Sequence, residues 1–310
     1  MPSAEFEAIK ARFSTMADSV DRGTPTLAEQ RAASEHFGDL AVEPEGVEVD
    51  YADADGVRVM AITPVDADPR RVIQFLHGGG YRLSSIESHR KLASHIAKTA
   101  GAIAFSVEYR LAPEHRHPAQ VEDSLTVYRW LLDRGYHGHE IALVGDSAGG
   151  GLALGTVLAL KDASMPLPAG VVAVSPWTDM TITGGSIVTR AATDLTPTAD
   201  FLPVLRDAFV SEDQWNDPRA SPLCGDLAGL PPIFLQAGDD ESLRDDAIRF
   251  GAKATQAGVD VTFDIVPEMQ HVFIRAVGSV PEADEGVARV GAFLRRSFVR
   301  AADGARTTAD

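Results

Sequence analysis

The sequence predicts an α/β fold with one mostly parallel central sheet that helices cover on both faces. Short apolar runs rich in β-branched residues recur along the chain, and helical stretches separate most of them. The runs are 71–76, 102–107, 141–144, 170–175, 232–237 and 261–266. Continuously apolar strands that alternate with helices are typical of a parallel sheet buried on both sides. Because the 310 residues contain no internal repeat and no low-complexity linker, we predict a single domain, 1–310.

The elements before the first parallel strand follow different patterns. Residues 4–17 and 27–38 have apolar side chains at helical spacing. The segments 47–51 and 57–62 alternate apolar and polar side chains around an Asp-Gly turn signal, which predicts a hairpin. Further along, we expect helices at about 87–99, 118–134, 148–161, 241–257 and 284–300.

The interval between the runs 170–175 and 232–237 is longer than a simple crossover needs. It contains a helical stretch with apolar side chains, which we interpret as an insertion over one end of the sheet. The N-terminal helices are apolar enough to join it. We therefore expect a helical cap formed by about 1–45 and about 180–215.

The composition limits the classes of partner and the cellular compartment that we expect for the protein. A formal net charge of −17 argues against nucleic acid or an anionic membrane as partner. No run of ~18 apolar residues predicts a membrane span, and the N-terminus lacks the apolar core of a signal peptide, so we expect a cytoplasmic protein. The single cysteine, Cys224, suits a reducing compartment and rules out an internal disulfide and a multi-cysteine metal site.

Ser147 lies in the segment GDSAG, between the run 141–144 and a predicted helix. Ligands of an open parallel sheet bind beyond the carboxyl ends of its strands, where this serine falls. The flanking glycines permit a sharp turn that raises the hydroxyl beside the unpaired amides of a helix start. A tight turn with an incidental serine is the competing interpretation. A phosphate-binding loop is excluded, because Gly150 is followed by Gly151 and Leu152 instead of lysine and a hydroxyl residue.

A serine nucleophile needs a base, an acid behind the base and donors for the developing negative oxygen. The segment HGGGY, 77–81, supplies a loop whose backbone N–H groups can converge on one point. Of the nine histidines, His271 follows the last predicted strand and is the best candidate base. Asp239 and Asp240 both follow the run 232–237, and spacing alone does not choose between them.

The other histidines are assigned no catalytic function. The pairs His115/His117 and His137/His139 lack carboxylates at ligand spacing, so we predict no metal site. His89 falls on a predicted helix and receives only an ordinary structural role.

With these residues assembled, the chain resembles the hormone-sensitive-lipase-like esterases of the α/β-hydrolase superfamily. The resemblance rests on HGGGY, EYRLAPEHRHPAQVED, GDSAGG, SPWTD, DPRASPL, DDESLRDD and PEMQHVF, and covers nearly the whole chain from about residue 45. It implies an α/β-hydrolase fold with Ser147 as nucleophile, His271 as general base and Asp240 as the acid that orients it. It further implies no cofactor, and backbone oxyanion donors at Gly79, Gly80 and Ala148.

The implied activity is hydrolysis of short-chain acyl esters through an acyl-enzyme. A lactone hydrolase or a small-molecule deacetylase would use the same residues. A non-catalytic receptor for a small ligand is the alternative from another class, although receptors that resemble this branch lose the histidine that is present here. The resemblance allows a monomer or a homodimer. Apolar candidates for substrate contact, each equally suited to core packing, are Tyr81, Trp177, Phe209 and Val272.

Overall fold

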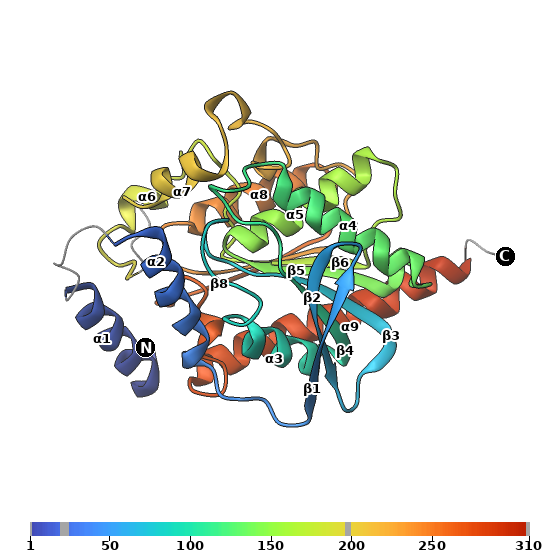
Figure 1. Ribbon diagram of the computed structural model, residues 1–310, viewed down its shortest axis with the longest axis horizontal. Coiled ribbons are helices and arrows are strands. Elements are labelled where there is room, and N and C mark those ends of the chain that lie inside the picture. The colour runs from blue at the N-terminus through green and yellow to red at the C-terminus, as the bar shows by residue number, and fades with distance from the viewer. Residues whose placement is uncertain (1, 19–24, 196–199, 308–310) are drawn as a thin grey trace.

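An eight-stranded sheet in the order β1-β2-β4-β3-β5-β6-β7-β8 forms the centre of the molecule in the computed structural model (Figure 1). The structure describes residues 2–18, 25–195 and 200–307, with no side chains described for 12–18 and 307. β1 and β2 form the expected hairpin, β2 also pairs antiparallel with β4, and every later pairing is parallel. The strands are β1 (Val47–Ala54), β2 (Val57–Pro64), β3 (Asp68–Leu76), β4 (Ala102–Val107), β5 (Ile141–Asp146), β6 (Gly170–Val174), β7 (Ile233–Gly238) and β8 (Val261–Val266). The predicted mostly parallel α/β sheet is confirmed.

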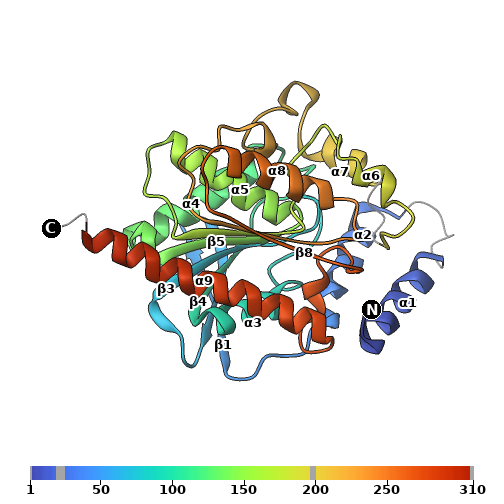
Figure 2. The ribbon, with the colours of Figure 1, turned by 180° about the vertical axis from the view of Figure 1, so that it is seen from behind.

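Helices cover both faces of this sheet, as Figures 1 and 2 show from opposite sides. Alternate residues of β3 point to the two faces: Val72 and Leu76 join the core under α4, α5 and α8, whereas Ile73 and Phe75 join the core under α3 and α9. The α-helices are α1 (Ala4–Asp18), α2 (Leu27–Ser34), α3 (Arg90–Ala100), α4 (Ala119–Asp133), α5 (Ala148–Asp162), α6 (Ser186–Thr189), α7 (Leu202–Phe209), α8 (Arg244–Gln256) and α9 (Pro281–Thr307). The 3-10 turns are η1 (Glu35–Leu40), η2 (Gly138–Glu140), η3 (Glu212–Gln214), η4 (Pro222–Cys224) and η5 (Phe273–Ala276).

Two helices, α8 and α9, have boundaries that differ from the sequence-based expectation, and the difference in α8 bears on function. The helix expected from residue 241 begins only at Arg244, because the preceding segment forms a loop at the carboxyl end of β7. The last helix runs from Pro281 to Thr307 and is longer than expected at both ends. Because the helix begins late, residues 239–243 form a loop whose side chains lie at the sheet edge where Ser147 also lies.

The N-terminal helices and the insertion gather at one end of the molecule, where both views place α2, α6 and α7 together (Figures 1 and 2). Arg31 of α2 donates to the carbonyl oxygens of Arg82 and Ala112 and pairs with Glu114. Its helix therefore docks on the loop that follows HGGGY. Residues 19–24 and 196–199, which fall within the two predicted cap segments, lie outside the described residues.

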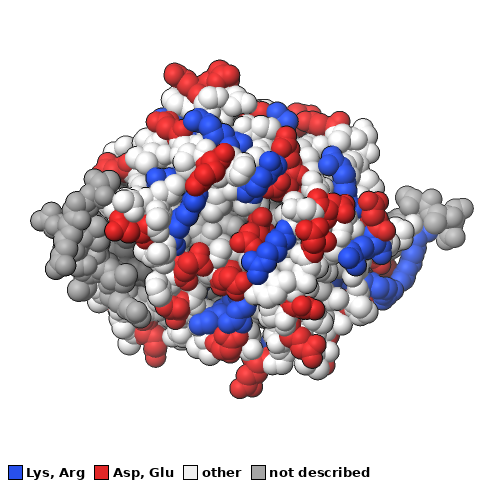
Figure 3. Space-filling model, viewed as in Figure 1, with Lys and Arg blue, Asp and Glu red and all other residues white. Residues whose placement is uncertain are grey.

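The described surface mixes both signs of charge despite the net charge of −17. On the face seen in Figure 3, Lys and Arg side chains alternate with Asp and Glu side chains and form no continuous basic patch among the described residues. Within the described ranges, no helix combines the length and apolar character that crossing a bilayer requires.

Candidate active site

Ser147 stands at the turn between β5 and α5 with a left-handed backbone, φ 54° and ψ −121°. A side chain at Gly149 would place its Cβ 2.0 Å from the carbonyl oxygen of Leu76, so the turn can pack on β3 only with glycine there. The Ser147 amide donates to Val174 of β6 at 2.7 Å. The strained turn that the GDSAG motif predicts is thus fixed by the strands on either side of it.

His271 meets this serine across the sheet edge. It follows β8 and precedes η5, and its Nε2 lies 2.9 Å from the Ser147 Oγ although 124 residues separate the two. Only 7% of the His271 side chain is exposed. A hydroxyl and an imidazole nitrogen at this distance can pass a proton between them. The structure therefore brings together the two residues that the sequence proposed as nucleophile and base.

The carboxylate that faces His271 belongs to Glu241 and not to Asp240, the residue that the sequence analysis expected to orient the imidazole. The Nδ1 atom of His271 lies 3.6 Å from Oε1 of Glu241, whose side chain is fully buried. The Asp240 amide donates to the carbonyl oxygen of Met269, and this contact turns the loop so that the next side chain points at the histidine. Asp239 faces away and pairs with Arg190 and Arg244. At 3.6 Å the contact is an ion pair longer than a hydrogen bond; such contacts in ligand-free sites often tighten when substrate binds.

Ser175 is a site residue that the sequence analysis missed. Its hydroxyl donates to Oε2 of Glu241 at 2.7 Å and accepts the Val272 amide at 3.0 Å. The Gly238 amide donates to the same carboxylate oxygen at 3.1 Å. Ser175 thus ties the acid to the residue after the base. Its position directly after β6, at the same edge as Ser147, was the available signal.

The surroundings of His271 act on its pKa in opposite directions. Burial disfavours the imidazolium and lowers the pKa, whereas the carboxylate of Glu241, with a smaller effect of Asp194, favours the charged ring. The carboxylates outweigh burial, so the pKa of His271 lies above its ordinary value. A raised pKa suits a base that must hold the serine proton and later return it.

The HGGG loop offers unpaired amides next to the serine. Gly79 and Gly80 have φ of 112° and 63°, which glycine adopts without strain. Within the described chain, the amides of Gly79, Gly80 and Ala148 donate to no other group. Such amides at a loop and a helix start can hold a developing negative oxygen.

His77 shapes this loop. Its ring stacks on Tyr109 with centroids 4.2 Å apart, and the Tyr109 hydroxyl donates to the His77 carbonyl oxygen at 2.7 Å. Burial lowers the pKa of His77 to about 3, so its imidazole is neutral near pH 7. A neutral, enclosed ring at this position supports the backbone and takes no part in proton transfer.

The four apolar candidates for substrate contact are buried. Tyr81 and Phe209 stack on each other with centroids 3.7 Å apart, and the Trp177 indole N–H donates to the Asp179 carbonyl oxygen. Val272 is also buried, and it lines a small cavity of about 20 Å³ beside His271 that α1 partly closes. These contacts place the four residues in the core around the site, and their contact with a substrate stays a prediction.

Leu205 of α7 is one of the apolar side chains that the predicted insertion offers for the pocket. A Cβ at Gly80 would lie 2.5 Å from its side chain, so Leu205 rests directly on the HGGG loop. This contact brings α7 against the loop that carries the proposed oxyanion amides.

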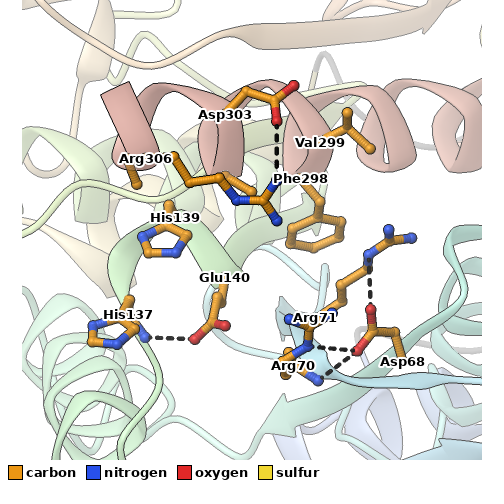
Figure 4. A pocket seen from close by; sticks show the side chains of 12 residues that line it. Asp68, Arg70, Arg71, His137, His139, Glu140, Phe298, Val299, Asp303 and Arg306 are labelled. Atoms are coloured by element: carbon orange, nitrogen blue, oxygen red, sulfur yellow. Dashed lines mark hydrogen bonds and ion pairs between the residues drawn. The ribbon is translucent and has the colours of Figure 1, made fainter. Parts of the chain in front are cut away.

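A second pocket, of about 540 Å³, lies at the opposite edge of the sheet (Figure 4). It is lined by residues at the amino-terminal ends of β3 and β5 and at the end of α9, and by none of the site residues above. Its arginines are paired with its own carboxylates: Asp68 with Arg70 and Arg71, and Asp303 with Arg306. Among the described residues, no group of three or more His, Cys, Asp or Glu side chains could hold a metal ion.

The chain is similar to known hydrolases and esterases over most of its length. Residues 73–275 match the family model of the alpha/beta hydrolase fold. An acetyl-hydrolase of Streptomyces hygroscopicus is 42% identical over 85% of this chain and 86% of its own length. The carboxylesterase NlhH of Mycobacterium tuberculosis is 31% identical over 92% of this chain and 91% of its own. A crystal structure of an esterase from the bacterial hormone-sensitive lipase family superposes with a TM-score of 0.91 at 36% identity, covering 96% of this chain and 99% of that one.

Proposed function

Because the chain belongs to the alpha/beta hydrolase fold family, among its hormone-sensitive-lipase-like esterases, we propose that it is a serine carboxylesterase acting on short-chain acyl esters. The observation that carries the proposal is the 2.9 Å contact between the Ser147 Oγ and the His271 Nε2, with Glu241 behind the imidazole. A serine is a weak nucleophile unless such a base takes its proton. The same contact argues against a non-catalytic receptor.

In the proposed reaction His271 takes the Ser147 proton as the hydroxyl oxygen attacks the ester carbonyl carbon. The carbonyl oxygen becomes negative and accepts hydrogen bonds from the amides of Gly79, Gly80 and Ala148. The imidazolium, stabilised by Glu241, then protonates the departing alcohol as the bond to it breaks. Water, deprotonated by the same histidine, attacks the acyl-serine and releases the carboxylic acid, and Ser147 regains its proton. No step in this scheme requires a metal or an organic cofactor.

We propose that the cap consists of about 1–45 and about 180–215 and limits the acyl chain. Leu205 on the HGGG loop and the α1 residues Phe6 and Ile9, which line the cavity beside His271, support this division. Short acyl groups are the size class that we expect this cap to admit. The acetyl-hydrolase among the relatives favours the same size class, and extends the proposal to acetyl groups on small molecules.

The proposal is tested with p-nitrophenyl butyrate. We expect the wild type to release p-nitrophenol and Ser147→Ala to lose this activity to the background rate. Ser164→Ala, which changes an exposed serine just beyond α5, serves as the matched control and keeps full activity. An organophosphonate should label Ser147 in the wild type and in the control. Ester hydrolysis by Ser147→Ala at a rate comparable to the wild type would refute the assignment.

A substrate panel and two physical measurements complete the assignment. Acyl esters, lactones and acetylated small molecules compared by kcat/KM separate the esterase from its alternatives that share the same residues. The expected substrate is a small molecule and the expected location is the cytoplasm, which fractionation of the native host tests. Sedimentation equilibrium decides between a monomer and a homodimer.

A further inference from the structure

One segment of the insertion between β6 and β7, residues 190–195, contacts both loops that carry the proposed acid and base. We call this segment the insertion strap. Gln270, the residue before the proposed base, is 7% exposed. Its Nε2 donates to the Thr193 carbonyl oxygen at 3.0 Å, and its Oε1 accepts the Leu195 amide at 2.8 Å. A single carboxamide therefore holds the backbone on both sides of Asp194.

The insertion strap also holds the loop that carries the proposed acid. Oδ2 of Asp194 accepts the Ser242 amide at 2.7 Å, and Ser242 directly follows Glu241. At the other end of the strap, Arg190 donates to Oδ2 of Asp239 at 2.9 Å. The strap thus connects the loop after β7 with the residue before the base.

The proposed acid and base need such a connection because their side chains are not hydrogen-bonded to each other. The 3.6 Å between Oε1 of Glu241 and Nδ1 of His271 exceeds a hydrogen bond, and among the described residues neither atom has another partner. Their separation is therefore set by the backbone and by groups that hold both loops. Ser175 is one such group, since it contacts Glu241 and the amide of Val272. The insertion strap is a second.

The insertion strap also brings a charge that acts on the imidazole. Burial lowers the pKa of His271, Glu241 and then Asp194 raise it, and Arg275 lowers it slightly. The three charged groups come from different elements: the loop after β7, the strap and η5. Asp194 can exert its effect only while the strap keeps its carboxylate in place.

Building on the proposed esterase activity, we propose that Gln270 and Asp194 are positioning residues that fix the acid and the base relative to each other through the insertion strap. Gln270 binds the strap to the base loop, and Asp194 binds the strap to the acid loop. Release of either end lets Glu241 move away from His271. The imidazolium that forms during the reaction then loses stabilisation, whereas the binding of the ester changes little. The proposed cap thereby contributes to the catalytic geometry itself.

The first test replaces Gln270 by methionine, which keeps the length of the side chain and removes the carboxamide. We expect kcat for p-nitrophenyl butyrate to fall about 10-fold while KM changes less than about twofold, as for a loss of transition-state stabilisation alone. The matched control is Gln256→Met at the exposed end of α8, which should have the kinetics of the wild type. Thermal unfolding shows that each variant is folded. An unchanged kcat in folded Gln270→Met overturns the proposal.

The second test asks whether the two residues act through the same bridge. Asp194→Ala should lower kcat by a similar factor, measured at the alkaline plateau of the pH profile. The double variant with Gln270→Met should lose no more than the larger single loss, because either change opens the bridge. Asp213→Ala, at an exposed position of η3, is the control and should keep full activity. Single losses that multiply in the double variant overturn the proposal.

The third test follows the protonation of His271 by NMR titration, with its signals assigned from a His271→Ala variant. Asp194→Asn keeps an oxygen that can accept the Ser242 amide but removes the charge, so the titration midpoint should move to lower pH. Gln270→Met should move it in the same direction, because the strap no longer holds the Asp194 carboxylate in place.

An unmoved midpoint in either variant overturns the proposal, so this test stands even if one of the two does not fold. In Gln256→Met the midpoint should equal that of the wild type. The titration needs no ester. It therefore distinguishes a failure of this proposal from a failure of the esterase assignment, which the hydrolysis assay of the wild type reports.

Discussion

Replacing Glu241 by glutamine should nearly abolish turnover, whereas Asp240→Asn should not. Both changes remove one charge at almost constant volume from consecutive residues, so each serves as the control for the other. Of these two residues, Glu241 is the one whose carboxylate faces the His271 Nδ1, at 3.6 Å. In Glu241→Gln the imidazolium formed during attack on the ester loses that partner. The glutamine amide can also donate to Nδ1, which would leave a proton on Nε2 and prevent it from accepting the Ser147 proton.

The expected size of the effect follows from the distance. Two unit charges 3.6 Å apart interact by ~5 kcal/mol at an effective dielectric constant of about 20. Each 1.36 kcal/mol corresponds to a tenfold change in rate, so kcat should fall by about 10³-fold. This agrees with the ~10⁴-fold loss on amidation of the acid in a well-studied serine protease. For Asp240→Asn we expect less than about a threefold change, in line with ordinary surface substitutions.

The assay is steady-state hydrolysis of p-nitrophenyl butyrate, with thermal unfolding of each variant to show that it is folded. Titration with an organophosphonate gives the active-site concentration, so kcat refers to intact sites. A large loss in Asp240→Asn together with near-normal turnover in Glu241→Gln would show that the assignment of the acid from this geometry is wrong.

Three further outcomes follow from the same network. In the pH profile of kcat/KM, the midpoint of the acidic limb should lie above the ordinary histidine pKa of about 6.5, because Glu241 raises the pKa of His271. In Glu241→Gln this midpoint should move to lower pH, because burial then acts on the pKa of His271 without the opposing carboxylate. A midpoint that does not move contradicts this prediction. Ser175→Ala should lower kcat about 10-fold by releasing the acid, measured with the same substrate. Gly149→Ala should lower the free energy of unfolding by ~2 kcal/mol or more in urea titration, since its Cβ would lie 2.0 Å from a β3 carbonyl oxygen. Gly304→Ala, whose added Cβ would meet no atom within 4 Å, should leave the free energy of unfolding unchanged.

The fold was predictable because one sequence pattern, a short apolar run followed by a helical stretch, recurs along the chain. The central strands β5, β6 and β7 are buried along their whole length, so each had to be a short apolar run, and all six predicted runs correspond to strands. The glycine-bearing turns were predictable for a steric reason. At Gly149 a side chain has no room, so the requirement is visible in the sequence itself.

The acid was not predictable in the same way. Asp239, Asp240 and Glu241 are consecutive, all carry carboxylates, and all follow β7. Which of them faces His271 depends on the path of the loop, and that path is set by a contact with Met269, about thirty residues away in the chain. The contact between His89 and Asp146 was not predictable for a related reason, because the two residues lie far apart in the sequence.

Residues that contact the substrate were also not predictable from the sequence, because the wall of a pocket and the core of a protein are both lined by apolar side chains. Tyr81 and Phe209 satisfied the sequence criterion, yet they stack on each other and fill the space beneath the insertion. Their burial has a functional consequence all the same. It anchors α7 to the residue that follows Gly80, and so holds Leu205 against the loop whose amides are to receive the oxyanion. Leu205, which we propose as the side chain that limits the acyl group, is then positioned by the core residues around it, and acyl-chain selectivity should respond to Leu205 more than to either aromatic ring.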